Sequence, residues 1–178
     1  MFKSDLFWIT ELEPLDADKL SRLMQSNSAR FQEFFPTTLS QNLTIEDSKA
    51  YILRKAIEHK NKIEFTFAIK ATLTQNLAGI IILKDLDMSK QAGEIAYAMD
   101  QKFEGHGWMT LAVKELSKYA FNKLDLKTLK IISHRTNLGS CKIAIKNGYA
   151  WQRTLKNEHT PVNSSPLDME LYELHAGC

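Results

Sequence analysis

One stretch of the sequence changes its periodicity twice between residues 94 and 121. Residues 94–99 (EIAYAM) read as a strand, residues 104–108 (EGHGW) interrupt the pattern with two glycines, and a long helical pattern follows. The apolar residues of that helical pattern are Leu111, Ala112, Leu116, Ala120 and Phe121. A strand, a glycine turn and a helix therefore follow one another directly, which is typical of folds that pack helices on a sheet.

The rest of the chain adds strands and helices around this stretch. One helix is expected after Asp16, a second after Thr44, which opens a capping box, and a third over residues 138–146, stopped by an Asn-Gly pair. Residues 31–43 are expected to form an aromatic loop between the first two helices. Further strands are expected at residues 7–10, 63–70, 77–83, 128–133, 149–153 and 167–172. This order predicts a mixed sheet with helices on its faces.

Length and composition restrict the chain further. At about 150 residues per domain, the 178 residues predict one domain over residues 1–178. The 23 Lys and Arg residues nearly balance the 21 Asp and Glu residues, so no polybasic field calls for nucleic acid as a partner. Cys141 and Cys178 form neither a disulfide framework nor a metal cluster, and no metal is expected. Since no apolar run approaches about 18 residues, we expect no membrane association and a cytoplasmic location.

The glycine turn has the chemistry of an anion site. Gly105, His106 and Gly107 directly precede the long helix, whose first amide groups lack intrahelical acceptors and lie at the positive end of the helix dipole. The two glycines allow the backbone to approach an anion closely. A plain turn is the alternative interpretation. The dinucleotide and P-loop fingerprints are both absent, because their glycine and lysine spacings do not occur.

Several segments in order resemble one enzyme family. The segments GEIAYAMD, FEGHGWMT, AFNKLDLKTL and TNLGSCKIAIKNGY, between residues 77 and 149, resemble the GNAT acetyltransferase superfamily. Within it they resemble the RimJ/RimL-like group, which acetylates the N-termini of ribosomal proteins. The resemblance implies an α/β (α+β) GNAT fold with a mixed, mostly antiparallel central sheet of about six to seven strands. It also implies helices on both faces and acetyl-CoA as cosubstrate.

The resemblance assigns acetyl-CoA contacts residue by residue. Residues 104–109 become the pyrophosphate loop, the strand ending at Met99 pairs with pantetheine, and Asn137 and Ser140 flank the thioester. The cofactor-binding residues that it implies are Tyr97, Ala98, Met99, Glu104, Gly105, His106, Gly107, Trp108, Met109, Asn137 and Ser140. The chain departs from the family at two of them. Glu104 stands where the family usually has Gln or Arg, and Met109 where it usually has Gly or Ala. The Glu104 carboxylate is therefore expected to face solvent or to pair with a base such as Lys102.

Acetyl transfer to an amine needs a base, an oxyanion donor and a proton for the thiolate. Glu94, on the strand beside the expected cofactor, is the first candidate base, with Glu158 and His159 as lesser ones. A backbone amide near residues 97–99 would meet the oxyanion, and Ser140 would return the proton to the thiolate. Asn137 completes the catalytic set. Each residue also has a structural interpretation, Glu94 as an ion-pair partner, Asn137 as a helix N-cap and Ser140 as part of the first helical turn.

The function expected from the sequence is acetyl-CoA-dependent N-acetylation of a primary amine by direct attack in a ternary complex. A protein N-terminus is the favoured acceptor. A small-molecule amine (amino sugar, polyamine or antibiotic) and a non-catalytic acyl-CoA-binding module are the alternatives. Residues 31–43 and 160–166 are expected to form part of the wall of the acceptor site. The protein is expected to be a monomer or a homodimer.

Overall fold

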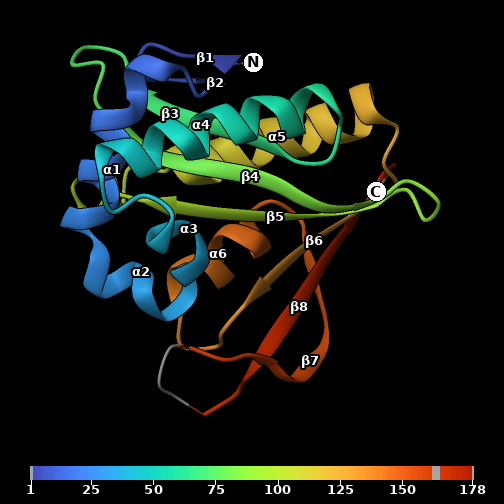
Figure 1. Cartoon of the computed structure of the whole chain (residues 1–178). Coiled ribbons are helices and arrows are strands. Elements are labelled where there is room, and N and C mark those ends of the chain that lie inside the picture. Colours follow the sequence, from blue (N-terminus) through green and yellow to red (C-terminus); the bar gives the residue numbers. More distant parts are fainter. Residues whose placement is uncertain (1, 162–164, 178) are drawn as a thin grey trace. The chain divides into compact units, whose positions relative to one another are not determined.

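The computed structural model describes residues 2–161 and 165–177 (Figure 1). Its strands are β1 (Phe2–Lys3), β2 (Phe7–Glu11), β3 (Phe65–Ala71), β4 (Leu77–Asp87), β5 (Ala92–Met99), β6 (Thr128–Ser133), β7 (Ala150–His159) and β8 (Leu167–His175). Its α-helices are α1 (Ala17–Ser26), α2 (Ser28–Phe34), α3 (Pro36–Ser40), α4 (Ile45–Lys60), α5 (Trp108–Leu124) and α6 (Leu138–Lys146). Two 3₁₀ turns, η1 (Pro14–Asp16) and η2 (Gln101–Phe103), precede α1 and the glycines.

The strands follow the order β1-β2-β3-β4-β5-β6-β8-β7. The pairs β1–β2, β2–β3, β6–β8 and β7–β8 are antiparallel, and β5–β6 is parallel. The prediction of a mixed, mostly antiparallel sheet flanked by helices is therefore confirmed, and the described residues form eight strands in place of six to seven. The additional strand is β1, whose two residues are too short to show a period in the sequence.

The chain divides into two compact units. The first comprises the chain up to Ile82 together with Tyr97–Trp108, and the second comprises Leu83–Ala96 and the chain from Met109 onward. Strands β4 and β5 each have residues in both units. The single domain expected from the length stays a prediction.

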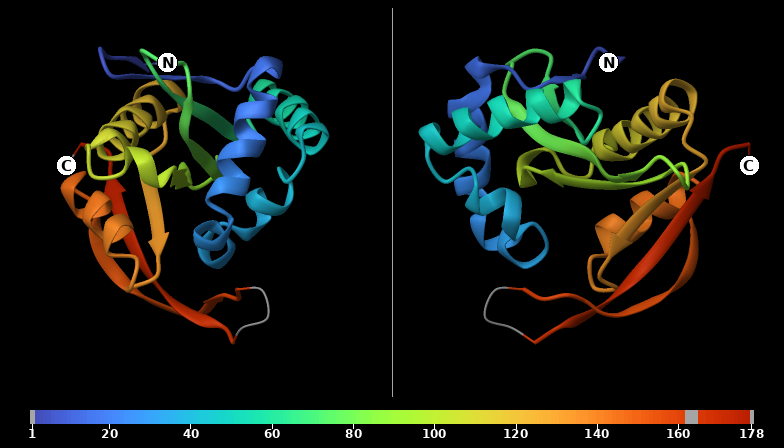
Figure 2. Two further views of the ribbon diagram at one scale, coloured as in Figure 1. Left: turned by 90° about the vertical axis from the view of Figure 1, so that its left-hand side faces the viewer. Right: turned by 45° about the vertical axis from the view of Figure 1, so that its right-hand side comes forward.

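In the first unit, α1 and α4 lie side by side (Figure 2) over a core that includes Leu20, Met24 and Ile80, each fully buried. Helix α4 begins at the predicted capping box. Thr44 Oγ1 accepts a hydrogen bond from the Asp47 amide at 3.0 Å, and an Asp47 carboxylate oxygen accepts one from the Thr44 amide at 3.1 Å. Two amide groups at the helix start are thereby satisfied, as the spacing of the two side chains predicted.

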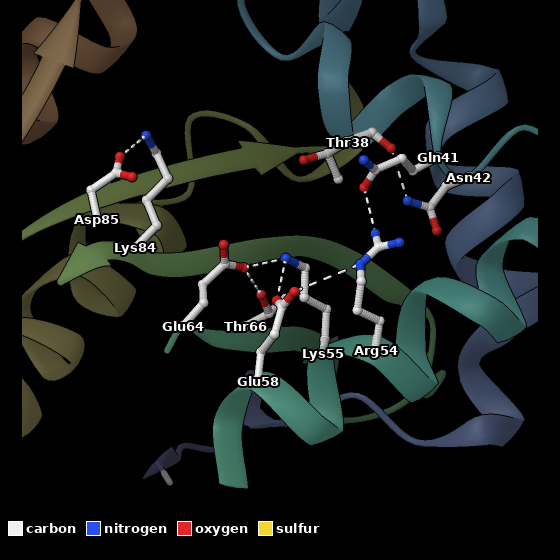
Figure 3. Close-up of polar contacts among 10 residues, drawn as sticks. All are labelled: Thr38, Gln41, Asn42, Arg54, Lys55, Glu58, Glu64, Thr66, Lys84 and Asp85. Carbon is white, nitrogen blue, oxygen red and sulfur yellow. Dashed lines mark hydrogen bonds and ion pairs between the residues drawn. The ribbon is translucent and has the colours of Figure 1, made fainter. Parts of the chain in front are cut away.

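An ion-pair network joins α4 to the start of β3 (Figure 3). The Lys55 ammonium lies 2.7 Å from a carboxylate oxygen of Glu58 and 2.7 Å from one of Glu64, the residue before β3. Arg54 also reaches Glu58, at 3.7 Å. Beneath these groups Tyr51 is buried, and burial raises the pKa of its hydroxyl well above the usual range. The network fixes the side of α4 that adjoins β3.

The aromatic loop expected over residues 31–43 is wrong. This segment contains most of α2 and all of α3, separated at Phe35. Phe31 is buried in the core of the first unit, which gives α2 an anchor, and Pro36 begins α3, where its fixed φ suits the first helical position. Helices of seven and five residues are too short to establish an apolar period, so the aromatic residues looked like an irregular segment.

In the second unit, β6 is paired on both sides. Its residues pair with all of the facing stretch of β8, from Thr128 opposite His175 to Ser133 opposite Glu170. With β5, the parallel register covers only Ala92 to Glu94 and stops there. Strands β7 and β8 form a long hairpin (Figure 2). Helix α6 ends where the sequence predicted, because Gly148 follows it with φ +82°, a conformation that favours glycine.

Candidate functional site

Residues 104–109, which we call the glycine loop, begin directly after η2 and end in the first turn of α5. Gly105 and Gly107 have φ +78° and +77°, so both occupy the left-handed region that favours glycine. A Cβ built on either glycine meets no atom within 4 Å, so the backbone there is approachable. Helix α5 begins at Trp108, immediately after the second glycine. The prediction of two glycines leading directly into a helix is confirmed as geometry.

Both ends of the glycine loop are fixed in the first unit. Before it, an Asp100 carboxylate oxygen accepts a hydrogen bond from the Lys102 amide at 3.1 Å and caps η2. Near its other end, the Trp108 ring stacks on Phe7 with centroids 5.1 Å apart, and its centroid lies 5.1 Å from that of the Phe103 ring. A loop held at both ends keeps its amide groups in place before a ligand arrives, which lowers the ordering cost of binding.

Glu104 pairs with Arg30 of α2. We expected this carboxylate to face solvent or to pair with a base such as Lys102, and it pairs with a base from a distant part of the chain. Arg30 Nη1 also donates to Asn27 Oδ1 at 3.1 Å, and the same oxygen accepts the Gln101 amide at 3.2 Å. The start of the glycine loop is therefore connected to the junction of α1 and α2 by polar contacts.

The end of β5 lies very close to β4. A Cβ on Gly79 would stand 2.5 Å from the Ala98 carbonyl oxygen, which excludes any side chain at position 79. The Asp100 amide donates to the Ala78 carbonyl at 2.8 Å and continues the attachment past the end of the strand. Residues 97–99, which the sequence assigned to pantetheine and the oxyanion, are thus held firmly along β4.

Glu94 forms an ion pair with Lys84 in the second unit, with a nitrogen–oxygen distance of 2.9 Å. Its side chain is 16% exposed. Burial raises the pKa of the Glu94 carboxyl, Lys84 opposes the shift, and the charges of Asp85 and Glu158 add to it. The structure therefore brings two of the three candidate bases, Glu94 and Glu158, within electrostatic range of each other. A carboxylate of raised pKa is a stronger base than an ordinary one.

Lys84 itself lies among carboxylates. It is 2.7 Å from a carboxylate oxygen of Asp85 (Figure 3) as well as 2.9 Å from Glu94. Burial lowers the pKa of the Lys84 ammonium, but the neighbouring carboxylates outweigh burial and the net shift is upward. Lys84 is a residue that sequence reasoning missed. The sequence feature that could have marked Lys84 was its position directly after the apolar run of residues 77–83.

The start of α6 confirms one structural interpretation. Asn137 Oδ1 accepts a hydrogen bond from the Ser140 amide at 3.2 Å, so Asn137 is the N-cap of the helix.

The residue after Ser140 is Cys141, whose thiol lies beside Tyr172 of β8. Burial raises the pKa of the Tyr172 hydroxyl to about 12, and its hydrogen bond with Cys141 adds to the shift. Tyr172 was not singled out in the sequence, because nothing in β8 marks it as a neighbour of α6.

The remaining predicted residues are placed as follows. His106 is exposed, with Nδ1 3.3 Å from the Phe103 carbonyl oxygen, and Met109 is buried in the first turn of α5. His159 ends β7, opposite Leu167. Of the acceptor segment 160–166, residues 162–164 lie outside the described residues. Within residues 2–161 and 165–177, no group of His, Cys, Asp and Glu has the arrangement of a metal site. No helix in that part of the chain is long and apolar enough to span a membrane.

Known proteins resemble this chain in sequence and in fold. Residues 7–150 match the family described as Acetyltransferase (GNAT) domain. YdaF of Bacillus subtilis (strain 168), which carries the name of a ribosomal N-acetyltransferase, is 30% identical over 165 residues. The aligned part covers 92% of this chain and 87% of YdaF.

Two solved structures share the architecture. The ribosomal-protein-S5-alanine acetyltransferase from Vibrio fischeri has a TM-score of 0.92 at 19% identity. The superposed part covers 99% of this chain and 96% of the Vibrio fischeri chain. The microcin C7 self-immunity acetyltransferase MccE, solved in complex with acetyl-CoA and AMP, has a TM-score of 0.86 at 21% identity, with coverage of 97% and 93%. At these identities the likeness shows the fold.

Proposed function

We propose that this chain, which belongs to the GNAT acetyltransferase family, uses acetyl-CoA to acetylate the N-terminal amine of a protein, with ribosomal proteins as the substrate class. The observation that carries the proposal is the glycine loop. Two glycines of positive φ lead directly into a helix of 17 residues, and the loop is held at both ends. This is a site at which backbone amides and a helix dipole can receive a diphosphate.

The cofactor is proposed to lie with its diphosphate at residues 104–109 and its pantetheine along β5. The register of β5 with β6 stops at Glu94, while β5 continues to Met99. The peptide groups of this continuation are proposed to pair with the amides of pantetheine, as a neighbouring strand would. Tyr97, Ala98 and Met99 belong to this stretch. Asn137 and Ser140, at the start of α6, are proposed to flank the thioester.

Direct transfer takes place in one ternary complex. Glu94, directly or through one water, takes a proton from the acceptor ammonium, and the neutral nitrogen attacks the thioester carbonyl carbon. A backbone amide near residues 97–99 stabilises the oxyanion of the tetrahedral intermediate. The carbon–sulfur bond then breaks, and the surplus proton on the attacking nitrogen passes through the Ser140 hydroxyl to the departing thiolate, so that the hydroxyl is restored. The products are the acetamide and free CoA.

An N-terminal amine suits the chemistry of this site. Its pKa is about 7.7 to 8.0, against about 10.4 for a lysine side chain, so a carboxylate base removes its proton far more easily. The names of YdaF and of the Vibrio fischeri structure point to the same class of acceptor. Residues 31–43, which contain most of α2 and all of α3, are proposed as part of the acceptor wall.

The proposal is tested with purified protein, acetyl-CoA and two acceptor panels. One panel holds peptides with free N-terminal Ala or Ser, each with an N-terminally blocked copy as control. The other holds polyamines, amino sugars and aminoacyl nucleotides. We expect free thiol release with the free peptides only, and mass spectrometry should place the acetyl group on the α-nitrogen. Peptides that stay unmodified while a small amine is acetylated would contradict the proposed acceptor.

A small-molecule amine is the second candidate acceptor. The fold likeness to MccE, a self-immunity enzyme whose structure holds AMP beside acetyl-CoA, favours it. The aminoacyl nucleotides in the second panel test it directly. Calorimetric binding of acetyl-CoA with no thiol release from either panel would instead identify an acyl-CoA-binding module without turnover.

A further inference from the structure

Arg30 forms an ion pair with Glu104 at the start of the glycine loop. We propose that Arg30 is a positioning residue for acyl-CoA, which neutralises the Glu104 carboxylate and so lets an acidic residue stand beside the diphosphate. The inference rests on the proposed function, because the glycine loop has to receive a diphosphate for the charge to matter. Both residues belong to the first unit, and their ion pair joins α2 to a loop far away in the sequence.

The charge argument starts from Glu104 alone. An unpaired carboxylate at the first position of the loop would repel an incoming diphosphate. Paired with Arg30, the two side chains together carry no net charge. The side chains are 39% and 46% exposed, so solvent screens the pair and the effect on binding is moderate.

Asn27 makes the position of Arg30 specific. Its side chain is buried at the junction of α1 and α2, where Nδ2 donates to the Leu23 carbonyl at 3.0 Å. Its Oδ1 accepts from both Arg30 Nη1 and the Gln101 amide. The same amide oxygen therefore fixes the guanidinium and the turn before the loop. A surface arginine that met Glu104 by chance would not share its anchor with the backbone of η2.

Helix α2 delivers the arginine from a rigid support. Phe31, the next residue, is 5% exposed and packs in the core of the first unit. The helix cannot turn about its axis without removing this ring from the core. Arg30 is thus presented toward the loop by a buried neighbour on one side and by Asn27 on the other.

The experiment separates charge from structure by using two donors. Arg30→Met, Glu104→Gln and the double variant are assayed with acetyl-CoA and with S-acetylpantetheine, which has no diphosphate. We expect Arg30→Met to raise KM for acetyl-CoA about threefold to tenfold while kcat and the kinetics with S-acetylpantetheine stay unchanged. Glu104→Gln in the Arg30→Met background should restore KM for acetyl-CoA, because the carboxylate is then gone.

Arg22→Met is the matched control. Arg22 forms an exposed ion pair with Asp18 on α1, at 2.7 Å, and its loss should leave both donors unaffected. An Arg30→Met variant with unchanged KM for acetyl-CoA, or with equal losses for both donors and no rescue, would overturn the inference.

A second measurement needs no cofactor. Amide hydrogen exchange in residues 101–108 of the free protein should be faster in Arg30→Met than in Arg22→Met. A wild-type protein that binds no acetyl-CoA in calorimetry would end the proposed function. Unchanged exchange in the loop would end the proposed positioning role by itself.

Discussion

The Lys84 ammonium lies 2.9 Å from the Glu94 carboxylate, and the carboxylate is the more buried of the two, 16% exposed against 32%. The pair sets two opposing influences on the proposed base. Burial raises the pKa of Glu94, and the lysine charge lowers it. The balance is a carboxylate that is still paired but accepts a proton at a higher pH than an ordinary glutamate.

Replacing Lys84 should change the pH dependence of the reaction. In Lys84→Met the charge and the hydrogen bond that oppose the upward shift are lost, so the pKa of Glu94 rises further. A protonated Glu94 cannot act as base, and the acid side of the kcat profile should therefore move to higher pH. The profile is measured at saturating acceptor, where kcat reports groups of the ternary complex. Lys84→Arg keeps the charge and should leave the profile near that of the wild type.

Removing the base itself should affect turnover more than binding. Glu94→Gln keeps the size of the side chain and leaves no carboxylate, and kcat should fall about 10²-fold to 10⁴-fold, the usual contribution of a general base. Calorimetric affinity for acetyl-CoA should be retained. Glu158→Gln tests the lesser candidate base in parallel, because the charge of Glu158 also raises the pKa of Glu94. If Glu94→Gln turns over like the wild type, Glu94 has only the structural role of an ion-pair partner.

A side chain at Gly107 should weaken cofactor binding through the backbone. The residue has φ +77°, which costs a residue with a Cβ about 1 to 2 kcal/mol, and a branched Cβ adds bulk at the amide that is proposed to meet the diphosphate. Gly107→Val should therefore lose affinity for acetyl-CoA in calorimetry. Gly177→Val is matched for backbone strain, with φ +87° and open space around the Cβ, and should keep the affinity. Equal affinities in the two variants would contradict the assigned loop.

Asn137 has a capping role that can be separated from a role in the reaction. Asn137→Ala should lose about 1 kcal/mol of unfolding free energy together with turnover. Asn137→Ser restores an N-cap side chain and should recover the stability in thermal unfolding. If Ser also restores turnover, the contribution of Asn137 is capping alone. If turnover stays low, its amide contacts the reacting groups.

Local signals predicted the fold well where both partners of a contact are near in sequence. The capping box of Thr44 and Asp47 and the glycine that ends α6 are examples, since each depends on residues within a few positions of each other. The helices over residues 28–40 were missed because what stabilises them is the burial of Phe31 in a core assembled from distant elements. Short helices contain too few apolar positions to show a helical period in the sequence.

The candidate site shows the same division. The glycine turn before α5 and the N-cap interpretation of Asn137 followed from the sequence, because turn and cap chemistry is local. The ion-pair partners of Glu94 and Glu104 did not follow. Arg30 reaches Glu104 across 74 positions, and Lys84 meets Glu94 only once β4 and β5 lie side by side. Charge pairing between such positions has no period or spacing that a sequence can display.

Position 79 shows how a residue that touches no substrate can still decide activity. Its missing side chain leaves room for a carbonyl oxygen of β5, and a backbone oxygen cannot rotate away as a flexible side chain would. Even alanine there would have to push the end of β5 outward, and the displaced residues would be those proposed to pair with pantetheine. In a saturation mutagenesis screen scored by turnover, substitutions at position 79 should therefore be tolerated poorly, although glycine offers no side chain to the reaction.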